Sequence, residues 1–206
     1  MTPATRRARA RRGEGELLRN EILAAAEQLL IQTGDDDAVS IRAIADAAGV
    51  TPPSIYLHFS DKTELLAAVC EARFRDFDQY LQEATAGIDD PLEALRARGR
   101  AYVRFGLEHP EHYRILFMTR AAAECAHNDV EDLPGLNAFA RLVDDVARAM
   151  DDGALAKGDA FLVATGLWTG VHGVTSLLIA RPDFPWPEQD LLLDHVLDTA
   201  VRGLVP

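Results

Sequence analysis

The amino-acid sequence predicts an all-α protein of about nine helices. Apolar residues recur at helical spacing along most of the chain, and glycine and proline residues interrupt this pattern at intervals. Neither internal repeats nor the period-two alternation of strands is found in the sequence. No apolar run is expected to reach the roughly 20 residues that a bilayer-spanning helix needs. We therefore expect helices that pack on helices around a shared core.

Charge is distributed unevenly along the 206 residues. The net charge is −12, yet residues 1–12 carry five arginines and no acidic residue. The remainder, with 16 basic and 33 acidic residues, has a net charge of −17. A basic arm on an acidic body is typical of a protein that touches a polyanion at one end, and a tail with incidental charge is the alternative. The arm lacks the apolar stretch of a secretory signal, which favours a cytoplasmic protein.

Four helical segments are expected in the first part of the chain. The first carries an apolar stripe from Leu18 to Leu29 and ends at Gly34, a residue typical of a helix C-terminus. Ser40 can cap a short second helix, which Gly49 ends.

The third and fourth segments begin with clear capping signals. Thr51 fits the N-cap of a short helix whose first two positions are prolines, where a missing N–H costs no helical hydrogen bond. Asp61 and Glu64 are expected to form a capping box. This box begins a long helix over 62–83.

Five further helices are expected in the rest of the chain. Asp90 and Pro91 begin the first of them, and Pro110 splits it from a short helix that ends near Phe117. Residues 119–132 are polar and weakly patterned. The last three helices are expected at about 134–151, 156–180 and 188–203.

The segment from Ser40 to Phe59 has the proportions of a helix-turn-helix. Ile55 and Phe59 would hold its second helix against the first. In such a unit the second helix enters the major groove of DNA, while the first crosses the backbone. The side chains left to face DNA are Pro52, Pro53, Ser54, Tyr56 and His58. A three-helix unit with no role in DNA binding is the alternative.

Three stretches within and after this segment carry a resemblance to a known family. They are IADAAGVT at 44–51, IYLHF at 55–59 and DKTELL at 61–66, where apolar, turn and polar positions all fall in register. On these residues the chain resembles the TetR/AcrR family of transcriptional regulators over about residues 18–70. The resemblance implies a three-helix DNA-binding domain followed by a helical domain that binds a ligand and dimerises.

The same resemblance implies a dimeric repressor. We expect an Arg-rich arm over 1–15, the helix-turn-helix domain over 16–62 and the regulatory domain over 63–206. Its partners would be a second copy of the chain, a palindromic double-stranded DNA operator and a small apolar or amphipathic effector that releases the operator. A ligand-independent regulator or an activator of the same fold is the alternative. The sequence carries no acid–base, nucleophile or phosphate-loop motif, so we expect neither an enzyme nor a cofactor.

Contacts to the DNA backbone follow from the resemblance. Tyr56 and His58 occupy positions that are expected to reach phosphate oxygens. Lys62, at the start of the fourth helix, is expected to clamp the backbone. Such contacts position a protein on DNA without reading its sequence.

Contacts to the bases are assigned in the same way. Arg42, Thr51 and Ser54 are the candidates for base edges or adjacent phosphates, and an arginine on guanine would discriminate most strongly. Pro52 and Pro53 depart from the small or polar residues that are commoner at these positions. We hypothesise that their rings pack on thymine methyl groups; the alternative is that they only begin the helix.

Aromatic side chains concentrate in the expected regulatory domain. Most belong to its core, and a minority could line an apolar pocket with a few polar anchors. Two stretches, Tyr102–Phe117 and Trp168–Gly173, are similar to a subgroup of the family with a Trp/His-Gly arrangement. The candidate pocket residues are Phe77, Tyr102, Phe105, His109, Tyr113, Phe117, Trp168 and His172.

A cluster of histidines raises the question of a metal site. His109 and His112 lie near His127 and two glutamates in the sequence. Metal-binding pairs on a helix favour i, i+4 spacing, and Pro110 interrupts this segment, so surface or structural histidines are the preferred interpretation. We expect no metal.

The last two helices carry apolar stripes. The resemblance implies that they pair with the same helices of a second subunit, and an intrachain core is the alternative. A dimer suits DNA binding because two recognition helices must meet half-sites about 34 Å apart. The candidate interface residues are Val171, Thr175, Leu178, Leu193, Val196, Leu197 and Ala200.

Overall fold

The computed structural model describes residues 14–118 and 134–204. Nine helices and no strand are found in these two ranges, which confirms the expected all-α fold. The helices are α1 (Glu14–Thr33), α2 (Ile41–Ala48), α3 (Pro52–Ile55), α4 (Lys62–Thr85), α5 (Pro91–Glu108), α6 (Pro110–Met118), α8 (Pro134–Asp151), α9 (Ala160–Ala180) and α10 (Gln189–Arg202).

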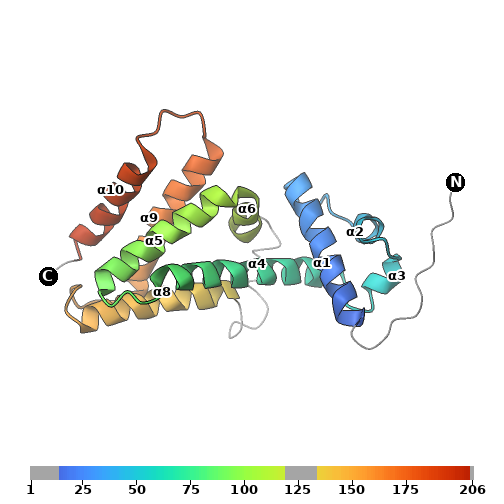
Figure 1. The fold of residues 1–206 in the computed structure, drawn as a ribbon, viewed down its shortest axis with the longest axis horizontal. Coiled ribbons are helices and arrows are strands. Elements are labelled where there is room, and N and C mark those ends of the chain that lie inside the picture. Colours follow the sequence, from blue (N-terminus) through green and yellow to red (C-terminus); the bar gives the residue numbers. More distant parts are fainter. Residues whose placement is uncertain (1–13, 119–133, 205–206) are drawn as a thin grey trace.

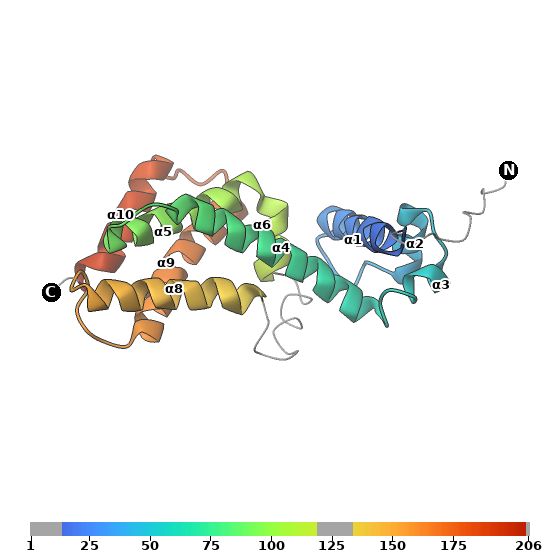
Figure 2. The same ribbon diagram turned by 60° about the horizontal axis from the view of Figure 1, so that its bottom comes forward.

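The helices form two units that α4 joins (Figure 1). We call α1–α3 with the first half of α4 the small unit, and the remaining helices with the second half of α4 the large unit. The two units lie at opposite ends of an elongated molecule, and α4 runs from one into the other (Figure 2). Near its start α4 packs against α1, and further along it packs against α5 and α8.

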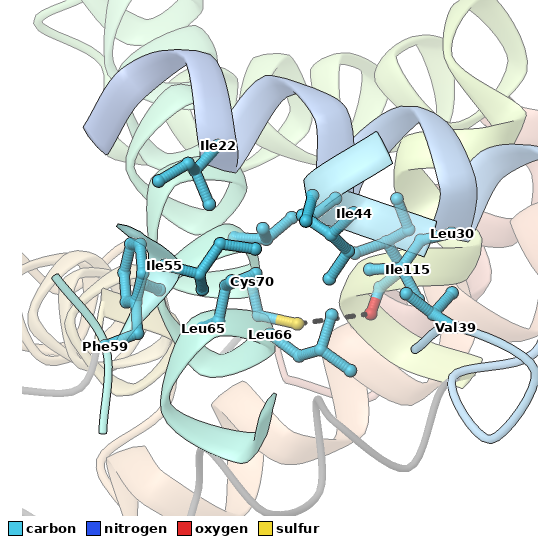
Figure 3. Close-up of a cluster of buried hydrophobic side chains, with 14 residues drawn as sticks. Ile22, Leu30, Val39, Ile44, Ile55, Phe59, Leu65, Leu66, Cys70 and Ile115 are labelled. Carbon is cyan, nitrogen blue, oxygen red and sulfur yellow. Dashed lines mark hydrogen bonds between the residues drawn. The ribbon is translucent and has the colours of Figure 1, made fainter. Parts of the chain in front are cut away.

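The core of the small unit is formed mainly by side chains of α1–α4, and one side chain of α6 joins them (Figure 3). Its buried side chains are Ile22, Ala26, Leu30, Val39, Ile44, Ala45, Ile55, Phe59, Leu65, Leu66, Ala68, Val69, Cys70 and Ile115. Thus α4 contributes as far as Cys70, and α6 contributes Ile115. The boundary expected between Lys62 and Thr63 marks the start of α4, and the packing of the small unit continues past it.

The large unit contains two further clusters of buried apolar side chains. One contains the buried aromatic side chains of Phe77, Tyr102, Phe105 and Tyr113 among aliphatic ones. The other lies around Val146 and is mainly aliphatic. Helix α5 packs against α4, α8 and α9, so it is the central helix of this unit.

The ends of α2 follow the expected chemistry. The Ser40 side chain accepts a hydrogen bond from the backbone N–H of Ala43 at 3.2 Å. Gly49 ends the helix in the left-handed conformation, with φ of 67°, which a glycine adopts without steric cost. Both capping predictions for this helix are confirmed.

At the start of α4 the predicted box is found in altered form. The Asp61 side chain accepts a hydrogen bond from the Glu64 N–H at 2.8 Å, as expected. The Glu64 carboxylate accepts from the N–H of Ser60 at 2.6 Å, whereas a capping box would use the N–H of Asp61. The Glu64 carboxylate therefore binds a backbone N–H of the turn that precedes the helix, and not that of the N-cap residue.

Helix α9 differs from expectation in two ways. It begins at Ala160 rather than at 156, because the Asp159 side chain caps it by accepting from the Leu162 N–H at 3.1 Å. The expectation about apolar runs is also wrong here: among the described residues α9 alone has the length and composition of a membrane-crossing helix. Little of it is buried within the chain, so α9 presents apolar surface outward.

Candidate nucleic-acid interface and sensing cluster

Helix α3 is a single turn held by two apolar anchors. Ile55 is fully buried and Phe59 is 2% exposed, and both lie in the core of the small unit. This confirms that they hold the second helix of the helix-turn-helix against the first. The residues between and before them are consequently turned toward the surface.

Thr51 occupies the N-cap position of α3, but its hydroxyl does not cap the backbone. A capping side chain accepts from the second or third N–H of the helix. Pro53 has no N–H, and the N–H of Ser54 is bonded to the Thr51 carbonyl at 2.8 Å. The Thr51 hydroxyl instead pairs with the Ser54 hydroxyl at 3.0 Å.

The residues predicted to meet DNA lie on the surface of the small unit to different extents. Tyr56 is 54% exposed. Arg42, Thr51 and Pro53 are also exposed, whereas Pro52, Ser54, His58 and Lys62 are half-buried. Leu57, which sequence reasoning did not single out, is 82% exposed beside Tyr56. An apolar side chain so open to solvent is a further candidate for contact with a base or sugar.

Lys62 has a second partner that the sequence did not predict. Its Nζ donates a hydrogen bond to the backbone carbonyl of Asp36 at 2.9 Å. This ties the start of α4 to the polar loop between α1 and α2. A lysine ammonium has three donors, so two remain for a phosphate oxygen.

Sequence reasoning also missed Arg19 of α1. Its guanidinium lies 5.0 Å from the centre of the Phe59 ring, which is cation–π range. The start of α1 also approaches the turn after α3, since a Cβ placed on Gly15 would lie 3.9 Å from His58 Cε1. Residues 1–13 of the expected arm lie outside the described residues.

In the large unit, three helices bring a set of polar side chains together. The Nδ1 atom of His172 on α9 lies 2.8 Å from the Tyr102 hydroxyl of α5 and 2.7 Å from the Tyr113 hydroxyl of α6. Trp168 Nε1 donates to the Tyr102 oxygen at 3.2 Å. The Ser176 hydroxyl, which the sequence did not point to, lies 3.3 Å from that of Tyr113. We call these five residues the sensing cluster.

Burial keeps the sensing cluster uncharged. It raises the pKa of both Tyr102 and Tyr113, and it lowers the pKa of His172. When Nδ1 of the neutral imidazole accepts a hydrogen bond from a tyrosine hydroxyl, the proton of the imidazole is on Nε2. No side chain of the described residues accepts a hydrogen bond from this Nε2 atom. Within the described residues the cluster members therefore bond to one another, and the Nε2 donor of His172 has no side-chain acceptor there.

Aromatic rings surround the sensing cluster. The Phe77 ring centre lies 5.3 Å from that of Tyr102, and the Phe117 ring centre lies 4.9 Å from that of Tyr113. Phe105 contacts Phe77 at 5.0 Å. Seven of the eight candidate pocket residues are thus brought together: Phe77, Tyr102, Phe105, Tyr113, Phe117, Trp168 and His172. Phe139, at 5.7 Å from Trp168, belongs to the same surroundings and was not predicted.

His109 is the predicted pocket residue that the structure leaves outside. It is exposed, and its ring stacks on that of His112 at 5.6 Å. It follows the last turn of α5, and its ring centre lies 5.3 Å from that of Phe105. Among the described residues no group of His, Cys, Asp and Glu has the arrangement of a metal site; His127 lies outside them.

The apolar stripes of α9 and α10 face into the chain. Five of the seven candidate interface residues lie in its own core, namely Val171, Thr175, Leu178, Leu193 and Leu197, and Val196 and Ala200 are half-buried. In the single chain those five side chains have little surface left for a second subunit, and the expected interface stays a prediction. The exposed apolar residues of these helices lie elsewhere, at Phe161, Leu162, Leu177 and Leu191.

Two known sequence families match the chain, one over each unit. Residues 22–69 match "Bacterial regulatory proteins, tetR family", and residues 95–202 match "Tetracyclin repressor-like, C-terminal domain". The second match alone covers more than half of the chain. The chain belongs to the TetR family. The resemblance read from the helix-turn-helix residues is thereby confirmed.

Relatives of this TetR-family chain include activators and repressors. The HTH-type transcriptional activator FasR of Mycolicibacterium smegmatis is 32% identical over 99 residues, 48% of this chain and 45% of FasR. The HTH-type transcriptional repressor BepR of Brucella suis is 36% identical over 88 residues, 42% of each protein. The match thus spans less than half of these two relatives. The uncharacterised regulator YobS of Bacillus subtilis is 28% identical over 193 residues, 92% of this chain and 93% of YobS.

Solved structures share the fold over most of the chain. A Rhodococcus protein of unknown function superposes with a TM-score of 0.76 at 28% identity, over 92% of this chain and 96% of that one. A putative TetR-family regulator from Shewanella gives 0.75 at 17% identity, over 92% and 98%. At 17% identity, the likeness to the Shewanella structure shows a shared fold alone.

Proposed function

We propose that this TetR-family protein is a dimeric repressor that leaves its operator when a small, uncharged effector binds at the sensing cluster. One observation carries the proposal: a buried group of mutually bonded side chains leaves the His172 Nε2 donor without a partner among the described residues. His172 is half-buried, so this donor is open to a ligand that brings a hydrogen-bond acceptor.

The chemistry of the cluster limits the effector. No member of the cluster is charged at neutral pH, since burial raises the pKa of the tyrosines and lowers that of the histidine. An ionic group placed there would lose its hydration without meeting an opposite charge. The surrounding rings of Phe77 and Phe117 favour an apolar body. The effector would be amphipathic, with a carbonyl, ether or hydroxyl oxygen near His172.

The small unit would hold DNA through α3 and its neighbours. Tyr56, His58 and Lys62 would contact phosphates, and Arg42, Thr51, Ser54 and the two prolines would lie near the bases. The Arg-rich arm would add phosphate contacts at the end where α1 approaches the turn after α3. A regulator of this kind acts where the chromosome is, so we place it in the cytoplasm.

A second copy of the chain would cover the outward face of α9 and α10. Phe161 and Leu162 are 62% and 68% exposed, and Leu191 is 66% exposed. Exposed apolar side chains concentrated on two neighbouring helices mark an interaction surface. Two-fold pairing there would place two copies of α3 on the half-sites of a palindromic operator.

The long helix α4 and the short helix α6 would carry the signal between units. Tyr113 belongs to the sensing cluster, and Ile115 of the same helix is buried in the core of the small unit. A ligand that moves Tyr113 therefore moves a side chain on which the small unit packs. A coupling of about 1–3 kcal/mol would change operator affinity roughly 5–150-fold.

A gel shift on the DNA upstream of the protein's own gene tests the DNA-binding part of the proposal. We expect a specific complex that weakens steeply as the salt concentration rises. Arg42→Ala should weaken this complex. Arg181→Ala, at an exposed residue after α9, should not.

A library of neutral and anionic compounds, screened by thermal shift, tests the sensing part. Neutral oxygen-bearing compounds should stabilise the wild type and not His172→Phe; binding that this variant retains would contradict the assignment.

An activator is the second candidate, because the relative FasR is named as one. A promoter–reporter assay separates the two. Expression that rises on deletion of the protein's gene supports the repressor, and expression that falls supports the activator.

A further inference from the structure

The two units touch at a second place besides the continuous helix α4. Helix α6 of the large unit packs against α1 of the small unit. Ile115 enters the core of the small unit, where the Cys70 Sγ lies 4.0 Å from the Ile115 carbonyl oxygen (Figure 3). An apolar side chain in a core fixes distance well but resists rotation poorly, because dispersion contacts have little directionality.

A directional contact lies beside this apolar one. The His112 Nε2 of α6 is 3.1 Å from Oε1 of Glu27 on α1. Arg73 of α4 approaches the same oxygen, with its Nε at 3.5 Å, and also pairs with Asp76 at 3.0 Å. Three helices from both units thus converge on one carboxylate.

The setting of Glu27 strengthens this contact. The carboxylate side chain is only 17% exposed, and those of His112 and Arg73 are 29% and 26% exposed. The hydrogen bond from His112 and the charge of Arg73 lower the pKa of Glu27 against the opposing effect of burial. Arg73 Nε makes no hydrogen bond within the described residues, so it holds Glu27 by charge alone. The His112 contact is therefore the one with a defined direction.

We propose that Glu27 is a positioning residue: through His112 it fixes the angle of the small unit on the large unit, and so sets which half-site spacing the dimer accepts. The inference rests on the proposed function, because it assumes that two copies bind one operator. A small change of angle where α1 meets α6 becomes a larger displacement at α3, which lies at the far end of the small unit (Figure 1). One base pair changes the half-site separation by about 3.4 Å, so spacing is a sensitive measure of that angle.

The test uses the full-length protein and needs no effector. Binding sites are first enriched from a random double-stranded DNA pool with the wild type. The affinity for the enriched site is then compared with that for versions carrying one base pair more or less at the centre. The ratio of these affinities is the spacing preference. It is measured for Glu27→Ala, for His112→Leu and for His112→Gln, which keeps a side-chain N–H donor.

Glu71→Ala is the matched control. Glu71 is an exposed carboxylate that pairs with Arg75 at 3.8 Å within α4, so its ion pair does not cross between the units. We expect the spacing preference to fall about fivefold or more in Glu27→Ala and in His112→Leu. Glu71→Ala should match the wild type, and His112→Gln should recover most of the preference. The double variant Glu27→Ala/His112→Leu should fall no further than either single variant.

Several outcomes would overturn the inference. One is an unchanged spacing preference in both Glu27→Ala and His112→Leu when circular dichroism shows both folded. Another is an equal fall in Glu71→Ala, which would indicate a general charge effect. A fall in melting temperature without a change in the preference would assign the contact to stability alone. If the wild type enriches no DNA sequence, the proposed function is contradicted, and this inference fails with it.

Discussion

Tyr113 and Ile115 are two residues apart on α6, yet they are buried in different units. Tyr113 is bonded to His172 at 2.7 Å within the large unit, and Ile115 lies in the core of the small unit with Cys70. Residues at this spacing point to different sides of a helix, so the large unit holds α6 on one side and the small unit holds it on the other. Any displacement of α6 at the sensing cluster is therefore felt by the small unit.

Ile115 should stabilise the small unit as much as its own core residues do. Because the side chain is 2% exposed, Ile115→Ala is expected to lower the free energy of unfolding by about 2–5 kcal/mol. Leu57→Ala, at a residue that is 82% exposed, should change it by less than about 0.5 kcal/mol. Urea denaturation followed by circular dichroism measures both. Equal effects of the two substitutions would show that α6 does not contribute to that core.

Protonation of His172 should destabilise the fold. Burial lowers the pKa of this imidazole in the folded protein, so the unfolded chain binds the proton more readily. Stability is then complete above the ordinary histidine pKa of about 6.5 and declines as the pH falls from there toward the folded pKa. Melting temperatures between pH 5 and 7 should therefore depend less on pH in His172→Gln than in the wild type. His195→Gln, at an exposed site on α10, should retain the wild-type dependence.

Lys62 should contribute one phosphate contact. Its Nζ already donates to the Asp36 carbonyl, which holds the ammonium beside the start of α4. Lys62→Ala should weaken operator binding similarly for all sequences and reduce the slope of log K against log salt by about 1. Lys157→Ala is the control, since Lys157 pairs with Asp151 at 2.6 Å in the large unit. An unchanged slope in Lys62→Ala would remove Lys62 from the DNA-contacting set.

The outward face of α9 should be required for dimerisation. Leu162 is 68% exposed in the single chain, and Leu162→Glu would place a charge on that face without disturbing the chain's own core. We expect this variant to sediment as a monomer at concentrations where the wild type is a dimer. Leu136→Glu, on α8 at a residue that is 43% exposed, provides the control. Dimers of both variants would place the interface elsewhere.

The order and extent of the helices could be predicted from local signals. Ser40, Gly49 and Asp61 end or begin helices where the sequence indicated, because capping depends on a few neighbouring backbone groups. The anchoring roles of Ile55 and Phe59 also followed from their spacing. The prolines before them had a consequence that was missed: Pro53 has no N–H for the Thr51 side chain to cap, and the Ser54 N–H is bonded to the Thr51 carbonyl.

The tertiary structure decided which face of each apolar helix is turned inward. The stripe through Val171, Thr175 and Leu178 has the spacing of an interface and of a core alike, and only the placement of α5 against α9 makes it a core. His109 and His112 were likewise neighbours in sequence without an evident purpose. Folding sends His112 to Glu27, 85 residues away in the chain, because α1 and α6 meet there.

By itself, then, the sequence determined an all-α chain, its helix boundaries to within a few residues, its family and the two anchors of the helix-turn-helix. These depend on periodicity, capping and a motif in register, all of which are local. The tertiary structure decided the bonding of Tyr102, Tyr113 and His172 and the contact between Glu27 and His112. Such pairs are fixed by how helices cross, which depends on the packing of the entire core and not on any one segment.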